Sequence, residues 1–83
     1  MFSHIMVGSN DVDRSRRFYD RLFEKEGRAD DKGRVAYRRN GSVFMISTPI
    51  DGQPACHSNG GTIGFNFDSP EDVDAWHRRG VEA

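Results

Sequence analysis

Apolar and polar residues alternate at the start of the chain, which is the pattern of a half-buried strand. The alternation predicts a strand over residues 2–7. Its two faces are Ile5 and Val7 on one side and Phe2, His4 and Met6 on the other. After a polar break, apolar residues recur at helical spacing, which predicts a helix from residue 12 with Asn10 or Asp11 as its N-cap. The inward face of this helix comprises Val12, Ser15, Phe18, Tyr19, Leu22 and Phe23.

The clearest local signal is Asn40-Gly41, which separates two strand-like runs at residues 34–39 and 42–47. Both central residues of a type I′ turn need a positive φ, and Asn-Gly adopts it readily. This two-residue turn fixes the register of a hairpin. One face is then Val35, Tyr37, Phe44 and Ile46, which we expect to pack under the helix. The other face is mixed and comprises Arg34, Ala36, Arg38, Val43, Met45 and Ser47.

The other segments have weaker patterns. Residues 24–33 are charged and contain either a short edge strand or only a loop. Residues 51–61 are rich in turn signals and form a linker loop. A further strand is predicted over residues 62–67, with Ile63, Phe65 and Phe67 on one face. Ser69-Pro70 then favours the start of a second helix, whose buried side is predicted to comprise Val73, Trp76 and Val81.

The two strand–helix units are alike in sequence. His4-Ile5-Met6-Val7 and then Asp11-Val12-Asp13 correspond to Thr62-Ile63-Gly64-Phe65 and then Asp72-Val73-Asp74. The offset of about 60 residues is within the range of repeated supersecondary units. We therefore expect one α+β domain over residues 1–83: a βαβββ module at 1–50, a linker at 51–61 and the start of a second module at 62–83. The second module is expected to be cut short, as in a fragment or a protein that completes its sheet with a partner.

Composition limits the classes of function. Twelve basic residues nearly balance 13 acidic ones, which argues against nucleic-acid binding and against a membrane-surface role. No stretch is apolar enough to span a bilayer, and the N-terminus lacks the features of a signal peptide. The single cysteine, Cys56, rules out an internal disulfide and favours a cytoplasmic location. We expect Cys56 to be an inert loop thiol.

These strand and helix sequences resemble the vicinal-oxygen-chelate superfamily, which includes glyoxalase I, bleomycin-resistance proteins and extradiol dioxygenases. The resemblance rests on a histidine in the first strand, His4, and on Phe18-Tyr19 in the first helix. It extends to Gly60-Gly61-Thr62-Ile63-Gly64-Phe65 with the second helix. The resemblance implies paired βαβββ modules whose sheets curve around one pocket, and in many members a divalent metal in that pocket.

The metal ligands that the resemblance implies are mostly missing here. His4 matches the histidine of the first strand. Residues 34–50 contain no Asp or Glu for the acidic ligand, and Thr62 stands where the second histidine would be. A catalytic zinc usually needs three protein ligands. We therefore expect no metal cofactor, with a divalent metal at His4 as the disfavoured alternative.

Pocket residues follow from the same strand faces. The ligand-binding candidates are His4, Met6, Arg38, Met45, Thr62 and Asn66. His4 is either a hydrogen-bonding or acid–base group or a pocket residue without a catalytic role. Arg38 either binds an anionic ligand through its fork of donors or lies in solvent. His57 beside Cys56 is not expected to form a catalytic pair, and His77 should be exposed.

Three functions remain open. The first is a metal-free small-molecule binder of the bleomycin-resistance kind, which needs a pocket but no full ligand set. The second is a metal-dependent lyase, similar to lactoylglutathione lyase, or a dioxygenase. The third is a structural or oligomerising domain, because unpaired strand edges favour pairing with another chain. We favour the first and expect a homodimer.

Overall fold

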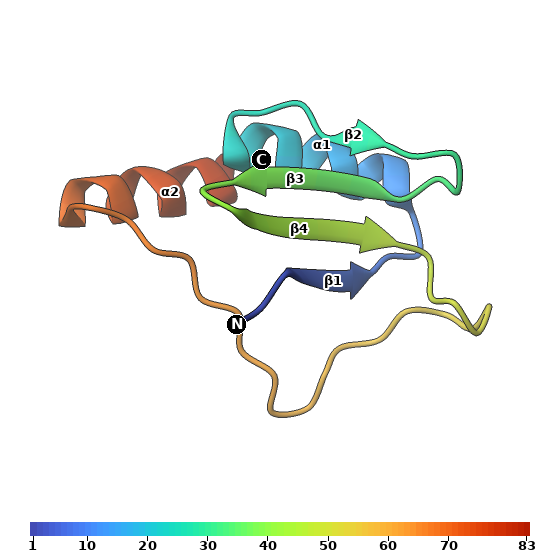
Figure 1. Ribbon diagram of the computed structural model, residues 1–83. Coiled ribbons are helices and arrows are strands. Elements are labelled where there is room, and N and C mark those ends of the chain that lie inside the picture. The colour runs from blue at the N-terminus through green and yellow to red at the C-terminus, as the bar shows by residue number, and fades with distance from the viewer.

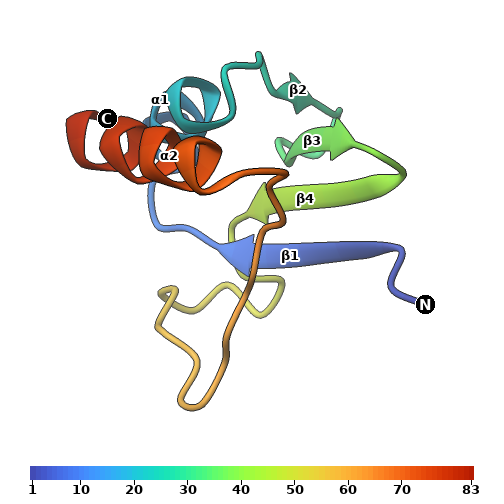
Figure 2. The same cartoon turned by 90° about the vertical axis from the view of Figure 1, so that its left-hand side faces the viewer.

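The strands form one mixed sheet, and both helices lie on the same side of it (Figure 1, Figure 2). The computed structural model describes residues 1–83. The elements in chain order are β1 (His4–Gly8), α1 (Val12–Phe23), β2 (Arg28–Ala29), β3 (Val35–Arg39), β4 (Ser42–Ser47) and α2 (Pro70–Glu82). This βαβββ order followed by a helix confirms the predicted α+β fold class. Neither helix is long and apolar enough to cross a membrane.

The sheet has the order β1-β4-β3-β2, so β1 and β2 are its two edges. β1 pairs with β4 in parallel, beginning at His4 opposite Val43, whereas the other two pairings are antiparallel. The strand therefore begins at His4 instead of at residue 2, because pairing with β4 begins there. The charged segment after α1 contributes only the two-residue edge strand β2, which was one of its two predicted forms.

The hairpin of β3 and β4 has the predicted turn and register. Asn40 and Gly41 have φ values of 50° and 82°, as a type I′ turn requires. Tyr37 lies opposite Phe44 and Val35 lies opposite Ile46. The four residues predicted to pack under the helix are all buried, and they form the core cluster.

Helix α1 covers this cluster because its apolar residues share one face. Leu22 is buried, and Val12, Tyr19 and Phe23 pack against the cluster. Asp11 is the N-cap, since its Oδ1 accepts a hydrogen bond from the Arg14 N–H at 3.0 Å. The rings of Tyr19 and Phe44 lie 4.9 Å apart, so the helix joins the sheet through an aromatic contact.

A partly buried polar contact closes the loop after α1. The Tyr37 hydroxyl donates to Asp20 Oδ1 at 2.7 Å, and the Gly27 N–H donates to the same oxygen at 2.8 Å. A Cβ at Gly27 would lie 2.5 Å from Val35 Cγ1, so only glycine fits between the loop and β3. Burial raises the pKa of Tyr37, and the hydrogen bond to Asp20 and its negative charge raise it further.

The second unit departs from its predictions. Residues 62–67 form no strand, because no other part of the chain offers them backbone hydrogen bonds. Ser69 caps α2 as predicted, with its Oγ accepting from the Asp72 N–H at 3.1 Å. The predicted buried side of this helix is wrong at Val73 and Val81, which are 49% and 74% exposed. The helix instead rests on α1 through Arg79 and Gly80, both near Leu22.

Candidate functional site

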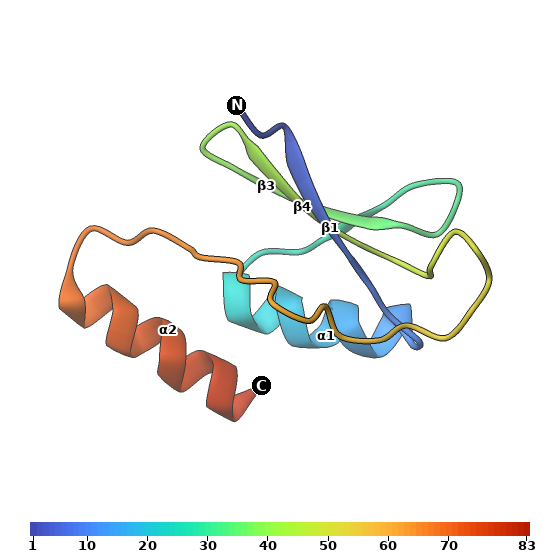
Figure 3. The same ribbon diagram turned by 90° about the horizontal axis from the view of Figure 1, so that it is seen from below.

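The sheet face that points away from α1 is free of helices (Figure 3). Residues that are paired across neighbouring strands point to the same face. Pairing therefore gives one row of His4, Val43 and Arg38, and a second row of Met6, Met45, Ala36 and Arg28. We call these seven residues the open face.

The open face has an apolar centre and a basic side. Val43 and Met45 occupy its centre on β4 and are half-buried. Arg28 and Arg38 are exposed, and no carboxylate oxygen lies within 4.0 Å of either guanidinium. None of these seven residues is Asp or Glu, and the next pair along β2 and β3 places Asp30 opposite Arg34, with the Asp30 carboxylate 2.7 Å from the Arg34 guanidinium. Arg28 and Arg38 are therefore the cations of the open face that are free to attract an anion.

His4 stands at the end of the first row and is exposed. Its Nδ1 lies 2.7 Å from Ser3 Oγ, which leaves the other ring nitrogen without a protein partner. An imidazole in this setting can donate or accept a hydrogen bond to a ligand.

The chain does not bring together the side chains that would hold a metal. His4 is the only histidine, cysteine or acidic residue of the open face, and no three such residues gather anywhere in the structure. A divalent cation bound by this chain alone would have one imidazole ligand, which is too few for a catalytic or structural site. The residues present therefore do not fit the metal that the family resemblance implies.

The six predicted ligand-binding residues separate into two groups. His4, Met6, Met45 and the Arg38 side chain lie together on the open face. Asn66 lines a separate cleft between the hairpin and residues 63–67. Thr62 is exposed and immediately precedes that segment. The strand pattern correctly places the first four on one face. It could not place the last two, because residues 62–67 are not paired into the sheet.

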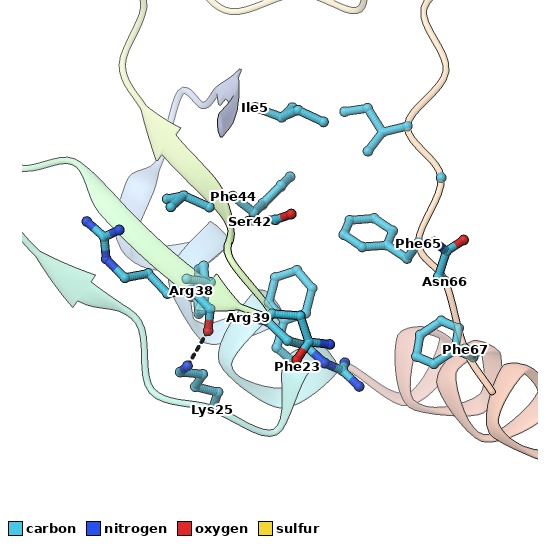
Figure 4. Close-up of a pocket in the computed structure, with 15 residues that line it drawn as sticks. Ile5, Phe23, Lys25, Arg38, Arg39, Ser42, Phe44, Phe65, Asn66 and Phe67 are labelled. Atoms are coloured by element: carbon cyan, nitrogen blue, oxygen red, sulfur yellow. Dashed lines mark hydrogen bonds between the residues drawn. The ribbon is translucent and has the colours of Figure 1, made fainter. Parts of the chain in front are cut away.

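The cleft lies between the tip of the hairpin and residues 63–67, and its volume is about 350 Å³ (Figure 4). Its apolar lining comprises Ile5, Phe23, Tyr37, Phe44, Ile63, Phe65 and Phe67, and Val43, whose side chain lies on the open face, borders the cleft from β4. Arg38 contributes its backbone to the cleft: its carbonyl accepts a hydrogen bond from Lys25 Nζ, while its side chain runs away from the cleft. Lys25 and Arg39 are the basic side chains at this site.

Sequence reasoning missed most of the cleft. The alternation of residues 62–67 identified the face of Ile63, Phe65 and Phe67 but not what it would oppose. Lys25 belongs to a segment without pattern, so nothing in the sequence linked it to Arg39. The cleft exists only because α2 holds residues 63–67 beside α1 and the hairpin, with the Phe65 and Trp76 rings 5.0 Å apart.

The remaining histidines and the cysteine form no further site. Cys56 and His57 are both exposed in the linker, and neither has a side-chain hydrogen bond. His77 is exposed on α2, as predicted. No nucleophile–base pair is present among them.

Two comparisons with known proteins bear on this fold and site. The family model described as the glyoxalase/bleomycin resistance protein/dioxygenase superfamily matches residues 1–83. The chain belongs to the glyoxalase/bleomycin resistance protein/dioxygenase superfamily. Among solved structures, it is similar to a glyoxalase/bleomycin resistance protein from Albidiferax ferrireducens T118, with 48% sequence identity and a TM-score of 0.90. No curated protein matches the chain.

Membership of this superfamily confirms the resemblance seen in the sequence. The alignment with the Albidiferax protein covers 99% of this chain and 68% of that one. The shared part therefore includes the open face, the linker and both helices. Superfamily membership fixes the fold and leaves the chemistry to the particular side chains of each member.

Proposed function

We propose that this protein binds a small organic anion on the open face of its sheet and needs no metal from its own side chains to do so. The observation that supports this most strongly is the pair of rows in which His4 and Arg38 flank Val43, beside Met6 and Met45. This arrangement combines an apolar surface with a guanidinium that has no protein carboxylate to bind.

Each side chain has a distinct part in this binding. Arg38 presents a planar fork of donors that suits a carboxylate or phosphate. Met6 and Met45 are flexible and polarisable, so they adapt to the apolar body of a ligand. His4 supplies one hydrogen bond through the ring nitrogen that Ser3 leaves free. Thr62 and Asn66 are not part of this group, because they lie on the segment that lines the cleft.

The proposal includes a second copy of the chain beside β1. The β1 edge is apolar, with Ile5 and Met6 both partly exposed, and its outer backbone groups have no partner. The β2 edge has only two residues and lies in a charged segment. Short and charged edge strands of this kind disfavour pairing with another chain. Association at β1 would give the open face a second wall. A cytoplasmic location fits this assembly, since it needs no disulfide at Cys56.

A thermal melt of the purified protein tests the binding. A panel of alkyl carboxylates and phosphonates is compared with the matched neutral amides. A compound that binds only the folded protein, at a hundred times its dissociation constant, adds about 2.7 kcal/mol to the free energy of unfolding. Anions are expected to raise the melting temperature, and Arg38→Gln should remove the shift. Arg17→Gln, on the exposed side of α1, is the matched control and should keep it.

The same melts separate the other two functions. Stabilisation by Zn²⁺, Ni²⁺, Mn²⁺ or Fe²⁺ that is lost in His4→Ala would contradict the proposal and favour a metal-dependent lyase or dioxygenase. No shift with any anion, together with a dimer by light scattering, would favour a purely oligomerising domain.

A further inference from the structure

The cleft is a second place where this chain can hold a small molecule, and it lies on the other side of the sheet from the open face. Its walls come from the hairpin tip and from residues 63–67 (Figure 4). The inference drawn from it does not depend on the function proposed for the open face.

The interior of the cleft is an aromatic surface that the chain itself leaves partly uncovered. The Phe65 ring lies 5.7 Å from that of Phe23 and 6.0 Å from that of Phe44, so one set of rings extends from α1 to β4. Phe65 is nevertheless 41% exposed, and Ile5 and Ile63, which also line the cleft, are 39% and 41% exposed. Burial of this surface would favour the binding of a flat apolar group.

Two cations, Lys25 and Arg39, stand at the rim of the cleft, and both also border a neighbouring hollow whose lining includes Glu24, Asp68 and Asp72. Lys25 Nζ donates one hydrogen bond to the Arg38 carbonyl, and an ammonium has two further N–H donors. The Arg39 guanidinium lies 5.7 Å from the centre of the Phe67 ring, so it stands at the aromatic wall. No residue that lines the cleft itself is Asp or Glu, and neither cation has a carboxylate oxygen within 4.0 Å.

We propose that this cleft binds a small aromatic carboxylate. The ring lies against Phe44 and Phe65, and the carboxylate accepts hydrogen bonds from Lys25 and Arg39. The volume of about 350 Å³ is within the usual range of small-ligand pockets. Neither cation has a carboxylate partner in the chain, which favours an anionic small molecule as the ligand. A neutral apolar segment of a second chain would leave both charges without a counter-ion.

The test uses 2-naphthoate as the probe, with neutral 2-naphthamide as its matched analogue. Isothermal titration calorimetry gives the affinity, and amide chemical shifts of ¹⁵N-labelled protein locate the site. Trp76 is the only tryptophan and packs on Phe65, so its fluorescence is an independent reporter. We expect 2-naphthoate to bind, with shifts at residues 63–67 and the hairpin tip. We expect 2-naphthamide to bind about a hundredfold more weakly, the cost of two charge-assisted contacts.

Variants identify the residues involved. Lys25→Gln and Arg39→Gln, both at exposed positions, are each expected to weaken 2-naphthoate binding about tenfold while leaving the affinity for 2-naphthamide unchanged. Phe65→Ala should weaken the binding of both probes. If Phe65→Ala does not fold, Phe65→Leu takes its place and should have the same effect. Arg38→Gln keeps the carbonyl that binds Lys25 and removes only the open-face guanidinium. It should leave 2-naphthoate binding at the cleft intact, which separates this proposal from the one above.

Three results would overturn the proposal. One is equal affinity for the acid and the amide, which would make the cleft a plain apolar groove. Another is a set of shifts confined to the open face, with binding lost in Arg38→Gln. The third is a dimer by light scattering whose formation excludes the probe, which would make the cleft an interface between copies.

Discussion

The two strand–helix units of this chain share a sequence pattern but differ in the partners that the chain gives them. In the first unit, β1 pairs with β4 along its whole length, and α1 covers the core cluster. In the second unit, residues 62–67 have no strand to pair with, and α2 has no buried residue. The difference shows that an alternating apolar pattern makes a segment able to form a strand, and a neighbouring strand decides whether it does.

The largest difference between the units is expected in the core. Ile46 is fully buried, so Ile46→Ala should lower the free energy of unfolding by about 2–5 kcal/mol. Ile63→Ala changes the same side chain at a position that is 41% exposed, and it should cost less than about 1 kcal/mol. Urea unfolding of both variants measures the contrast. Equal losses would mean that the second unit is as well packed as the first.

A second contrast concerns the polar contact between α1 and β3, which the second unit lacks. Tyr37→Phe removes a partly buried hydrogen bond to the Asp20 carboxylate and should cost about 1.5–3 kcal/mol at neutral pH. The folded protein raises the pKa of Tyr37, so the contribution is complete below the unfolded-state value of about 10 and is lost as the pH rises above it.

The wild-type protein should therefore lose more stability than Tyr37→Phe between pH 9 and pH 12. This range is chosen around the unfolded-state pKa of tyrosine, which is about 10. Urea midpoints across this range measure the difference. Tyr19 is present in both proteins, so the effect of burial on its own pKa cancels in the comparison. Parallel curves for the two proteins would contradict the assigned role of Tyr37.

The two helix caps give the smallest contrast. Asp11→Ala should lower the global stability by about 0.5–2 kcal/mol, because α1 is part of the core. Ser69→Ala removes an equivalent cap but should mainly reduce the helix content of α2, which buries no residue. Circular dichroism and Trp76 fluorescence during urea unfolding distinguish the two effects. A loss of global stability in Ser69→Ala equal to that in Asp11→Ala would be inconsistent with this view.

Local signals in the sequence were sufficient for the first unit. Asn40-Gly41 determines a turn of only two residues, and that turn fixes which residues of the hairpin share a face. The positions of Arg38 and Met45 on the open face follow directly. His4 and Met6 join them because β1 pairs with β4 in register, and the alternation of the first strand predicted only that these two residues share a face.

The same reasoning failed where the outcome depended on distant parts of the chain. Residues 62–67 alternate like a strand, but the pattern does not say whether a partner exists. Val73 and Val81 recur at helical spacing, but α2 turns Arg79 and Gly80 toward α1 instead. Lys25 reaches the hairpin because its Nζ donates to the Arg38 carbonyl, and Arg39 lies against the Phe67 ring; no local pattern records either contact.

Amide hydrogen exchange measures whether residues 62–67 have a strand partner, at a protein concentration where light scattering gives a monomer. We predict slow exchange for the amides that join β1, β4 and β3. The amides of residues 62–67 should exchange at the rate of an unprotected chain, since none of them donates a backbone hydrogen bond. Protection of residues 62–67 to the level of β1 in the monomer would contradict this difference between the two units, because the second unit would then have a strand partner within the chain.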